Sequence, residues 1–259
     1  MKKRYGLKRT GVSSPIDYSR ELNPQQLEAV TAPDGPALVI AGAGSGKTRV
    51  VTYRVAYLLE KGIKPEEILL LTFTKKAADE MLRRVEILVQ KDVSRIWGGT
   101  FHHVGNRVLR RHAELLGISD NYTILDRDDS RVLMDSVIRE MGVDVRAQRF
   151  PKGKVLIEII GYGRNADIGI DQALEIKAPH FLRLAAPIKQ AAARYHQKKK
   201  SRNYLDFDDL LIFLDRILSE HPRIRDQYRQ RFKYILVDEY QDTNRIQAKI
   251  VDALLSERK

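Results

Sequence analysis

Two short stretches, far apart in the sequence, carry residue types that act together on phosphates. The first is AGAGSGKT, in which glycines at 42, 44 and 46 lead into a lysine and a threonine. Glycines let the backbone bend so that successive N–H groups converge on phosphate oxygens, while the lysine and the hydroxyl can reach the terminal phosphates and Mg²⁺. The loop residues expected to bind the nucleotide are Gly42, Ala43, Gly44, Ser45, Gly46, Lys47 and Thr48.

The second stretch, YILVDEYQDTN, places two carboxylates directly after a run of apolar residues. In P-loop folds, Mg²⁺ is held by the loop threonine and by an acidic residue that ends another strand of the same sheet. We therefore expect Thr48 and Asp238 to bind Mg²⁺, and Glu239 to orient and deprotonate the attacking water. Taken alone, the carboxylate pair is more simply an exposed surface feature; the phosphate loop in the same chain favours catalysis.

The elements that must position these residues alternate between apolar runs and helical patterns. Apolar runs over 37–41, 68–73, 95–100 and 234–238 predict strands, and helices are expected over about 47–61, 75–90 and 101–116. Such alternation is typical of a parallel sheet with helices on both faces. The run over 37–41 is expected to be a buried strand that carries the phosphate loop.

The pattern changes between about 117 and 200, where charged helical segments follow one another without a clear buried strand. We interpret this region as a mainly helical insertion within the α/β domain. Residues 1–20 mix Lys, Arg, Gly, Ser and Pro without periodicity, which predicts a flexible basic arm.

Composition narrows the class of protein. The chain of 259 residues has a net charge of +12 and no cysteine. The basic excess indicates either a nucleic-acid partner or simply a solvated basic surface. Disulfides and cysteine-bound metals are excluded, and an intracellular, cytoplasmic protein is expected. The six histidines lack metal-site spacing, and no apolar run is long enough for a membrane span.

Several motifs together resemble one family. LNPQQLEAV, AGAGSGKTRV, LTFTKKAADEM, GGTFHHV, LDFDDLL and ILVDEYQDTN occur in the order and spacing of the UvrD/PcrA/Rep helicases of superfamily 1. The resemblance covers 22–259, and Ala41, in place of the glycine of the general phosphate-loop pattern, is usual in that family. Lys75 stands where the family usually has asparagine, and His103 where it often has serine.

The resemblance implies an ATP- and Mg²⁺-dependent 3′–5′ DNA helicase, acting on single-stranded and duplex DNA in repair or replication at the nucleoid. It implies a P-loop, RecA-like first motor domain over 21–112 and 203–259, with a helical inserted subdomain over 113–202. The family's next motif and second motor domain do not follow. The chain is therefore expected to be an N-terminal portion that needs the remaining helicase domains and does not unwind DNA alone.

Further residue roles come from the resemblance alone. Gln26 aligns with the glutamine that binds adenine, and Arg49 with an arginine near the nucleotide. Gln241 aligns with a residue near the γ-phosphate, and together with Glu239 and Lys47 completes the expected catalytic group. Without the resemblance, Gln26, Arg49 and Gln241 would each be interpreted as an ordinary polar surface residue.

The expected DNA contacts lie after two of the strands. Thr72, Phe73 and Thr74 follow the strand over 68–73, and Thr100 and His102 match the family's T-F-H motif. The carboxyl edge of an open α/β sheet usually binds ligands, and an exposed phenylalanine there can stack a base. A core position for the phenylalanine is the alternative.

Three charged groups keep two interpretations each. Arg107, Arg110 and Arg111 share one helix face, which is either a phosphate stripe or a solvated face. Lys198–Lys200 either approaches duplex DNA or ends a helix in solvent. The acids of DFDDL, at 206–210, suggest a nuclease metal cluster, but a structural role at an amphipathic helix start is favoured.

At the level of the whole chain, a standalone nucleotide-gated DNA-binding module is the alternative to part of a helicase. A P-loop kinase or transporter ATPase is disfavoured, because it predicts no DNA-side motifs.

Overall fold

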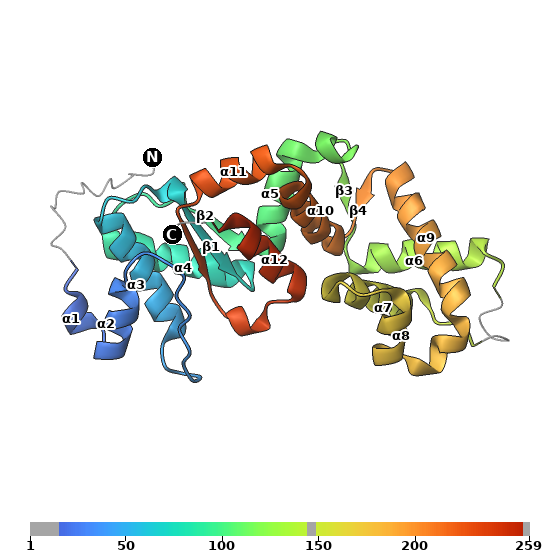
Figure 1. The fold of residues 1–259 in the computed structure, drawn as a ribbon, viewed down its shortest axis with the longest axis horizontal. Coiled ribbons are helices and arrows are strands. Elements are labelled where there is room, and N and C mark those ends of the chain that lie inside the picture. The colour runs from blue at the N-terminus through green and yellow to red at the C-terminus, as the bar shows by residue number, and fades with distance from the viewer. Residues whose placement is uncertain (1–15, 144–148, 256–259) are drawn as a thin grey trace, which may run out of the picture.

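The computed structural model describes residues 16–143 and 149–255. A part built around a sheet is joined to a separate group of helices (Figure 1). The sheet contains β1 (Ile68–Thr72), β2 (Trp97–Thr100) and β5 (Tyr234–Val237). Their order is β2-β1-β5, and both pairings are parallel. The carboxyl ends of all three strands therefore lie at one edge.

Helices cover both faces of this sheet. Side chains of β1 alternate between the two faces and therefore pack in two separate cores. Leu69 and Leu71 pack in one core with α5 (Phe101–His112), α10 (Phe207–Glu220), α11 (Pro222–Arg231) and α12 (Arg245–Leu254). Ile68 and Leu70 pack in another with α3 (Lys47–Glu60) and α4 (Lys75–Val89). All five side chains of β1 are buried, as a two-sided parallel strand requires. The predicted α/β class with a parallel sheet is confirmed.

The prediction of a buried strand over 37–41 is wrong for this structure. The segment is not in a strand, and Leu38, Val39 and Ile40 are 72%, 46% and 88% exposed. A strand needs a neighbour that satisfies its N–H and C=O groups. In the described residues β5 pairs with β1 only, so the segment joins no ladder. The apolar run signals a preference for burial, but it cannot supply the neighbouring strand.

The segment before the phosphate loop is partly helical. The helices α1 (Tyr18–Glu21) and α2 (Pro24–Thr31) precede the loop, and the side chain of Asn23 caps α2. The hydroxyl of Tyr18 donates to Glu60 on α3, at 2.7 Å. The predicted arm therefore ends before residue 18, and its first fifteen residues lie outside the described part of the chain.

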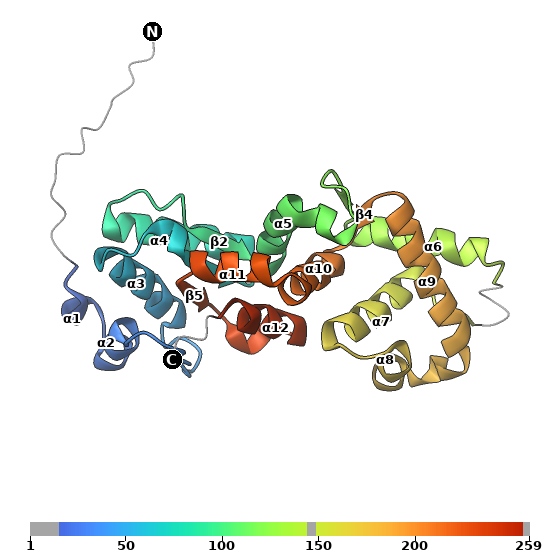
Figure 2. The same ribbon diagram turned by 45° about the horizontal axis from the view of Figure 1, so that its top comes forward.

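The region between β3 (Thr123–Ile124) and β4 (Tyr204–Leu205) consists mainly of helices and has its own core. Its helices are α6 (Arg127–Glu140), α7 (Gly153–Ala166), α8 (Ile170–Lys177) and α9 (Ala185–Ser201), grouped at one end of the molecule (Figure 2). The parallel pair of β3 and β4 lies where the chain enters and leaves the group. The buried cores change over between Tyr122 and Leu125, later than the expected boundary at 112.

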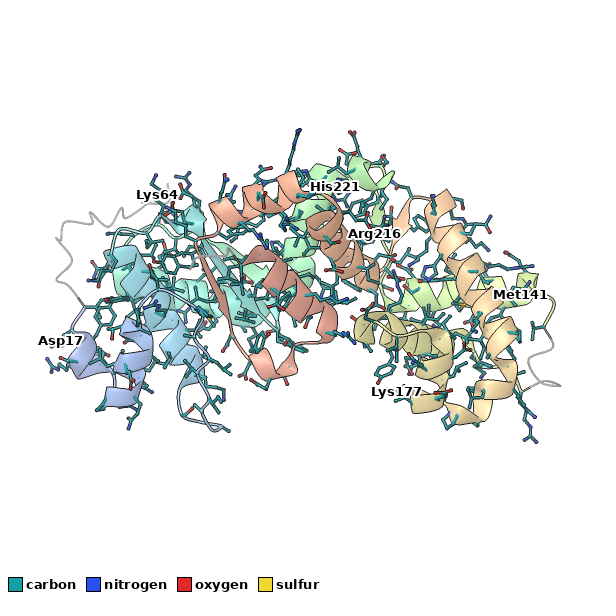
Figure 3. All side chains as sticks on the ribbon, in the orientation of Figure 1. Asp17, Lys64, Met141, Lys177, Arg216 and His221 are labelled. Carbon is teal, nitrogen blue, oxygen red and sulfur yellow. The ribbon has the colours of Figure 1, made fainter. Side chains whose placement is uncertain are left out.

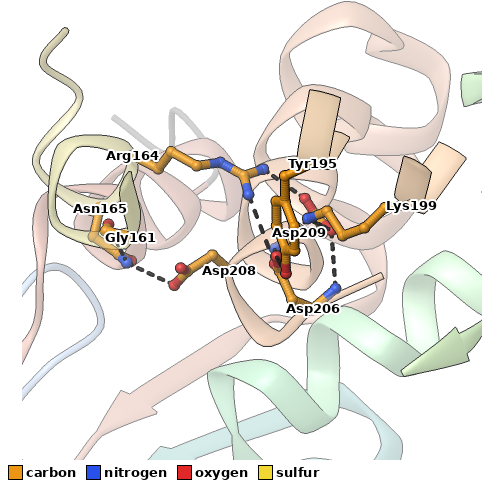
Figure 4. Close-up of polar contacts among 8 residues, drawn as sticks. All are labelled: Gly161, Arg164, Asn165, Tyr195, Lys199, Asp206, Asp208 and Asp209. Atoms are coloured by element: carbon orange, nitrogen blue, oxygen red, sulfur yellow. Dashed lines mark hydrogen bonds and ion pairs between the residues drawn. The ribbon is translucent and has the colours of Figure 1, made fainter. Parts of the chain in front are cut away.

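A buried ionic cluster fastens the insertion to the start of α10 (Figure 4). Lys199 of α9, only 3% exposed, is ion-paired with both Asp206 and Asp209. Arg164 of α7 donates to Asp209 at 2.6 Å and lies 3.6 Å from Asp206. Burial favours the neutral acid, but the Lys199 and Arg164 charges outweigh it and lower the pKa of Asp206 to about 2.

These contacts bear on two of the alternatives left open by the sequence. Lys199 points into the protein, so it is neither a DNA contact nor part of a solvated helix end. Asp206 caps α10 and its carboxylate is fully engaged, which supports the structural role for DFDDL.

A second link joins α7 to α12, where Asn244 donates to Asn165 at 2.9 Å.

No helix among the described residues is long and apolar enough to cross a bilayer.

Candidate nucleotide-binding site

The glycine-rich loop takes a conformation that side chains would oppose. Gly44 and Gly46 have φ angles of +76° and +85°, in the left-handed region that glycine adopts without strain. A Cβ at Gly46 would also lie 2.8 Å from Nε2 of Gln26. Gly46 is the last residue before α3, so the loop leads directly into a helix N-terminus, where partial positive charge favours an anion.

Lys47 folds back into the curve of this loop. Its Nζ donates to the carbonyls of Ala41 and Gly42, both at 3.3 Å. The hydroxyl of Ser45 donates to the carbonyl of Gly42 at 2.7 Å. The ammonium group thus lies where the loop's backbone converges, the position expected of a phosphate-binding lysine.

The two stretches singled out in the sequence meet across 190 residues of chain. Thr48, in the first turn of α3, donates its hydroxyl to a carboxylate oxygen of Asp238 at 3.3 Å. Asp238 directly follows β5, and its N–H donates to the carbonyl of Leu71 on β1 at 2.9 Å. The parallel sheet therefore produces the predicted proximity of the loop threonine and the acidic residue.

Asp238 is a buried acid without an ion-paired cation among the described residues; its exposure is 7%. Burial and the neighbouring Glu239 charge raise its pKa, against the smaller opposing effects of Thr48 and Lys47. A bound cation would relieve this unfavourable environment. Carboxylate and hydroxyl oxygens are the donors that Mg²⁺ prefers, so Thr48 and Asp238 are chemically suited to hold it.

Glu239 is held in a strained conformation beside Asp238. Its φ of 53° lies in the left-handed region, which is costly for a residue with a side chain. The turn η4 (Tyr240–Asp242) follows it, and Gln241 donates a hydrogen bond from its amide to the Glu239 carboxylate. The predicted base and Gln241, which is expected near the γ-phosphate, are therefore in direct contact.

A hollow of about 440 Å³ joins these groups to the loop after β1. Its lining residues are Thr48, Phe73, Thr74, Ala77, Glu80, Met81, Arg84, Asp238, Glu239 and Asp242. Glu80, Arg84 and Asp242 were not anticipated from the sequence. The last of these, two positions beyond Tyr240 in DEYQD, is the one that the motif could have indicated.

The other two predicted nucleotide residues have partners within the protein. The Gln26 amide donates to the Ser45 carbonyl at 3.0 Å and accepts from the Asn23 N–H at 3.2 Å. Arg49 is paired with Glu21 at 3.0 Å and lies over the Tyr53 ring. The glutamine touches the loop, whereas the arginine is directed toward α1, so nucleotide contact requires each to exchange these partners.

The predicted DNA residues lie at the carboxyl ends of β1 and β2 but differ in accessibility. Phe73 is 61% exposed, so the core alternative for it is excluded. Thr72 is 2% exposed and donates to the Thr74 carbonyl, so its hydroxyl is already engaged within the protein. Thr74 and Thr100 are N-caps of α4 and α5.

His102 lies in a second hollow, of about 250 Å³, shared with Thr100, His103, Asn106 and Phe207. The rings of His102 and Phe207 meet edge to face, 5.7 Å apart. Burial lowers the pKa of His102, so at neutral pH it offers a neutral ring N–H rather than a charge. Phe207, 44% exposed, was not anticipated, although it stands inside the DFDDL motif.

The described residues contain no group of three or more His, Cys, Asp or Glu side chains arranged to hold a metal ion. The proposed Mg²⁺ ligands, a hydroxyl and one carboxylate, would not form such a group, because in this chemistry phosphates and water complete the coordination.

Comparison with known proteins adds an independent finding. The family model described as the UvrD/REP helicase N-terminal domain matches residues 22–259. The chain is 40% identical over 245 residues to the ATP-dependent DNA helicase UvrD1 of Mycobacterium tuberculosis, covering 93% of this chain and 31% of that protein. It is 40% identical over 242 residues to the ATP-dependent DNA helicase PcrA of Staphylococcus epidermidis, covering 93% of this chain and 32% of the relative.

The ATP-dependent DNA helicase PcrA of Staphylococcus aureus is 39% identical over 251 residues, again with 32% of its length covered. The chain therefore spans about a third of the length of the curated relatives that it matches.

Proposed function

Because the chain belongs to the UvrD/REP helicase N-terminal domain family, we propose that it is the ATP-binding part of an ATP-dependent 3′–5′ DNA helicase. It would act inside the cell, in DNA repair or replication. Its relatives are named ATP-dependent DNA helicases. The observation that carries the proposal is the 3.3 Å contact between Thr48 and Asp238, which joins a phosphate loop to an acidic strand end.

In this proposal the loop and the N-terminus of α3 bind the phosphates. Lys47 moves from the carbonyls of Ala41 and Gly42 to the β- and γ-phosphate oxygens, which are stronger acceptors because they are charged. Thr48 and Asp238 hold Mg²⁺, which supplies neutralisation of the charge that develops on the phosphates. Gln26 exchanges the Ser45 carbonyl for the adenine edge.

Glu239 then accepts a proton from the water that attacks the γ-phosphate. Its contact with Gln241 supports a joint role of the two residues in hydrolysis. Protonation of the Glu239 carboxylate would weaken the hydrogen bond that the Gln241 amide donates to it. The left-handed backbone at Glu239 supports a site in which position matters more than local stability.

Single-stranded DNA would follow the same edge of the sheet. Phe73 stacks a base, and Thr74, Thr100 and His102 contact the sugar–phosphate backbone, while Thr72 shapes the turn that presents Phe73. Phe73 and Thr74 also line the hollow that contains Asp238 and Glu239, so a change at the nucleotide can reach the DNA through a shared wall.

We also propose the RecA-like motor domain over 21–112 and 203–259, with 113–202 as its inserted subdomain. The separate buried cores on the two sides of the β3–β4 pair support two such units, although the cores change over between Tyr122 and Leu125 rather than at 112.

The test is binding of a fluorescent ATP analogue to the 259-residue chain. Lys47→Ala removes a charged hydrogen bond, a kind worth about 1.5–3 kcal/mol, so we expect affinity to fall by roughly tenfold or more. Lys61→Ala, at the opposite end of α3, is the matched control and leaves affinity unchanged. Equal affinity of the wild type and Lys47→Ala would remove the phosphate-loop assignment.

A further inference from the structure

The structure separates the three arginines that share a face of α5 in the sequence. Arg110 donates to the carbonyls of Asp120 and Tyr122 and stacks 3.8 Å from the Tyr122 ring centre, so its role is structural. Arg107 and Arg111 instead approach Trp97. Their surroundings indicate a second site, separate from the nucleotide site.

Three guanidinium groups converge on the indole ring of Trp97. The guanidinium carbons of Arg107, Arg231 and Arg111 lie 3.8, 4.8 and 5.2 Å from the ring centre. We call these three residues the Trp97 arginine cluster. Arg107 and Arg111 are exposed on α5, Arg231 ends α11, and Trp97 beneath them is 1% exposed. Together they form one basic surface on a rigid aromatic base.

This cluster has no acidic counterpart among the described residues. None of its three guanidiniums takes part in an ion pair there, and Nε of Arg231 is buried without a hydrogen-bond acceptor. Asp226 of α11 contacts Arg225 and Arg229 instead, at 3.6 and 3.9 Å.

The other titratable groups beside the cluster are two histidines and the Tyr228 phenol, which stays neutral at neutral pH because burial raises its pKa. Burial, together with the charges of Arg111 and His221, lowers the pKa of His112 on α5, and His221 marks the turn between α10 and α11 (Figure 3). Burial and the charges of Arg111 and Arg231 lower the pKa of Arg107 in the same way. Like charges held this close repel, so an anion bound between them gains affinity from all three.

From this geometry we propose that the Trp97 arginine cluster is a binding site for the backbone phosphates of duplex DNA. Guanidinium groups form paired hydrogen bonds with phosphate oxygens, and three neighbouring groups can engage adjacent phosphates.

The absence of an accessible aromatic face favours a duplex over a single strand. Trp97, Tyr228 and Phe232 pack against one another and are 1%, 2% and 4% exposed. Binding of single strands relies on bases stacked on exposed aromatic rings, whereas contacts to a duplex can be made entirely with phosphates, since its bases are already stacked inside. The cluster offers charge without a stacking surface.

The cluster is also separated from the predicted single-strand contacts. Trp97 is the first residue of β2 and Thr100 the last, so they lie about 10 Å apart at a strand rise of ~3.3 Å per residue. The cluster therefore faces the amino edge of the sheet, and a duplex segment there leaves the carboxyl edge free.

Trp97 is the only tryptophan in the chain, so its fluorescence reports on this site directly. Titration of the 259-residue chain with a short blunt duplex should change the emission saturably. The variant Arg107→Gln/Arg111→Gln/Arg231→Gln should lose about tenfold or more in duplex affinity, and its salt-dependence slope should fall by roughly 2–3. Its affinity for oligo-dT, measured by anisotropy, should change by less than about twofold because phosphate contacts are local.

A charge-matched control, Arg20→Gln/Arg139→Gln/Arg216→Gln, changes three exposed arginines on other helices. Equal loss of duplex affinity in the two triple variants would overturn the proposal, because it would reveal a general charge effect. Unchanged Trp97 emission with the duplex would overturn it too, as would tighter binding of poly-glutamate, which would make the surface a site for acidic proteins. Should the cluster variant not fold, Arg111→Gln alone should still weaken duplex binding by about threefold.

Discussion

Two buried aspartates show opposite electrostatic environments in the two halves of this molecule. Asp206, at the insertion junction, is paired with Lys199 and Arg164, and their charges lower its pKa to about 2. Asp238, after β5, has no ion-paired cation in the described part of the chain, and burial raises its pKa. The first carboxylate already has its cations, which suits an anchor. The second has a favourable place for a cation, which suits a metal-binding site.

The two lysines differ in the same way. Lys199 is 3% exposed and ion-paired with two carboxylates, which compensate its charge. Within 16–143 and 149–255, Lys47 is bound only to neutral carbonyls at 3.3 Å, which a phosphate can replace. Residue type alone does not distinguish a Lys–Asp pair that anchors the fold from one that serves a nucleotide site. The two are distinguished by whether each charge is already paired with an opposite charge of the protein.

The largest effect is expected at the junction. Lys199→Met leaves Asp206 and Asp209 buried with only Arg164 to balance them, which should lower the free energy of unfolding by about 3–5 kcal/mol. Urea unfolding followed by circular dichroism measures this change. Lys200→Met, at the exposed next position, should change stability by less than about 0.5 kcal/mol. Similar losses in both variants would contradict the anchoring role.

Neutralising the two aspartates should change stability in opposite directions. Asp206→Asn leaves Lys199 and Arg164 with one carboxylate and should destabilise the chain by about 1.5–3 kcal/mol. Asp238→Asn removes a charge whose burial is unfavourable, and should be neutral or stabilising by up to ~1 kcal/mol. The comparison uses unfolding without nucleotide or Mg²⁺. Equal destabilisation by both substitutions would break the contrast between the two sites.

Acid should weaken the insertion through His196. Burial, together with the Arg164 and Lys199 charges, lowers its pKa from 6.5 to about 4. The unfolded chain therefore takes up a proton at higher pH than the folded chain. Stability is complete above about 6.5 and is lost as the pH falls toward 4, while Asp206 stays ionised.

This loss should be on the order of 1–3 kcal/mol, and thermal unfolding across that pH range measures it. In His196→Gln the slope should largely disappear, whereas His180→Gln, at an exposed position, should retain it. A pH slope that persists in His196→Gln would assign the effect to other groups.

The smallest effect is expected at the exposed ion pair beside the nucleotide loop. Arg49 and Glu21 retain 45% and 48% side-chain exposure, so Glu21→Gln should cost at most about 1 kcal/mol. Because it releases Arg49, ATP-analogue affinity should stay equal or rise. A large loss of stability would instead show that this pair stabilises the fold, as the buried ion pairs of Lys199 do.

The sequence predicted most of what local pattern and motif spacing determine. Asn23 capping α2, the buried β1 and the contact between Thr48 and Asp238 all follow from short-range signals combined with a parallel sheet. The exposed segment 37–41 could not be foreseen, because burial of a strand depends on a neighbour that its own residues do not encode.

Side-chain direction was the other limit of prediction. Lys198–Lys200 has the pattern of a solvated helix end, yet Lys199 is buried because carboxylates of the following motif face it. Arg110 and Arg111 are neighbours in sequence, but only one reaches Trp97. Such outcomes depend on which element packs against the helix, and that is set by the tertiary fold.

The most direct test of the account is Mg²⁺-dependent ATP-analogue binding by the wild type and by Asp238→Asn, with each protein titrated in Mg²⁺ and in EDTA. We expect Mg²⁺ to strengthen binding to the wild type by roughly tenfold or more, and Asp238→Asn to bind with the weaker, Mg²⁺-independent affinity while remaining folded. An Asp238→Asn variant that keeps the full Mg²⁺ effect would contradict the central claim that this buried carboxylate completes the nucleotide site.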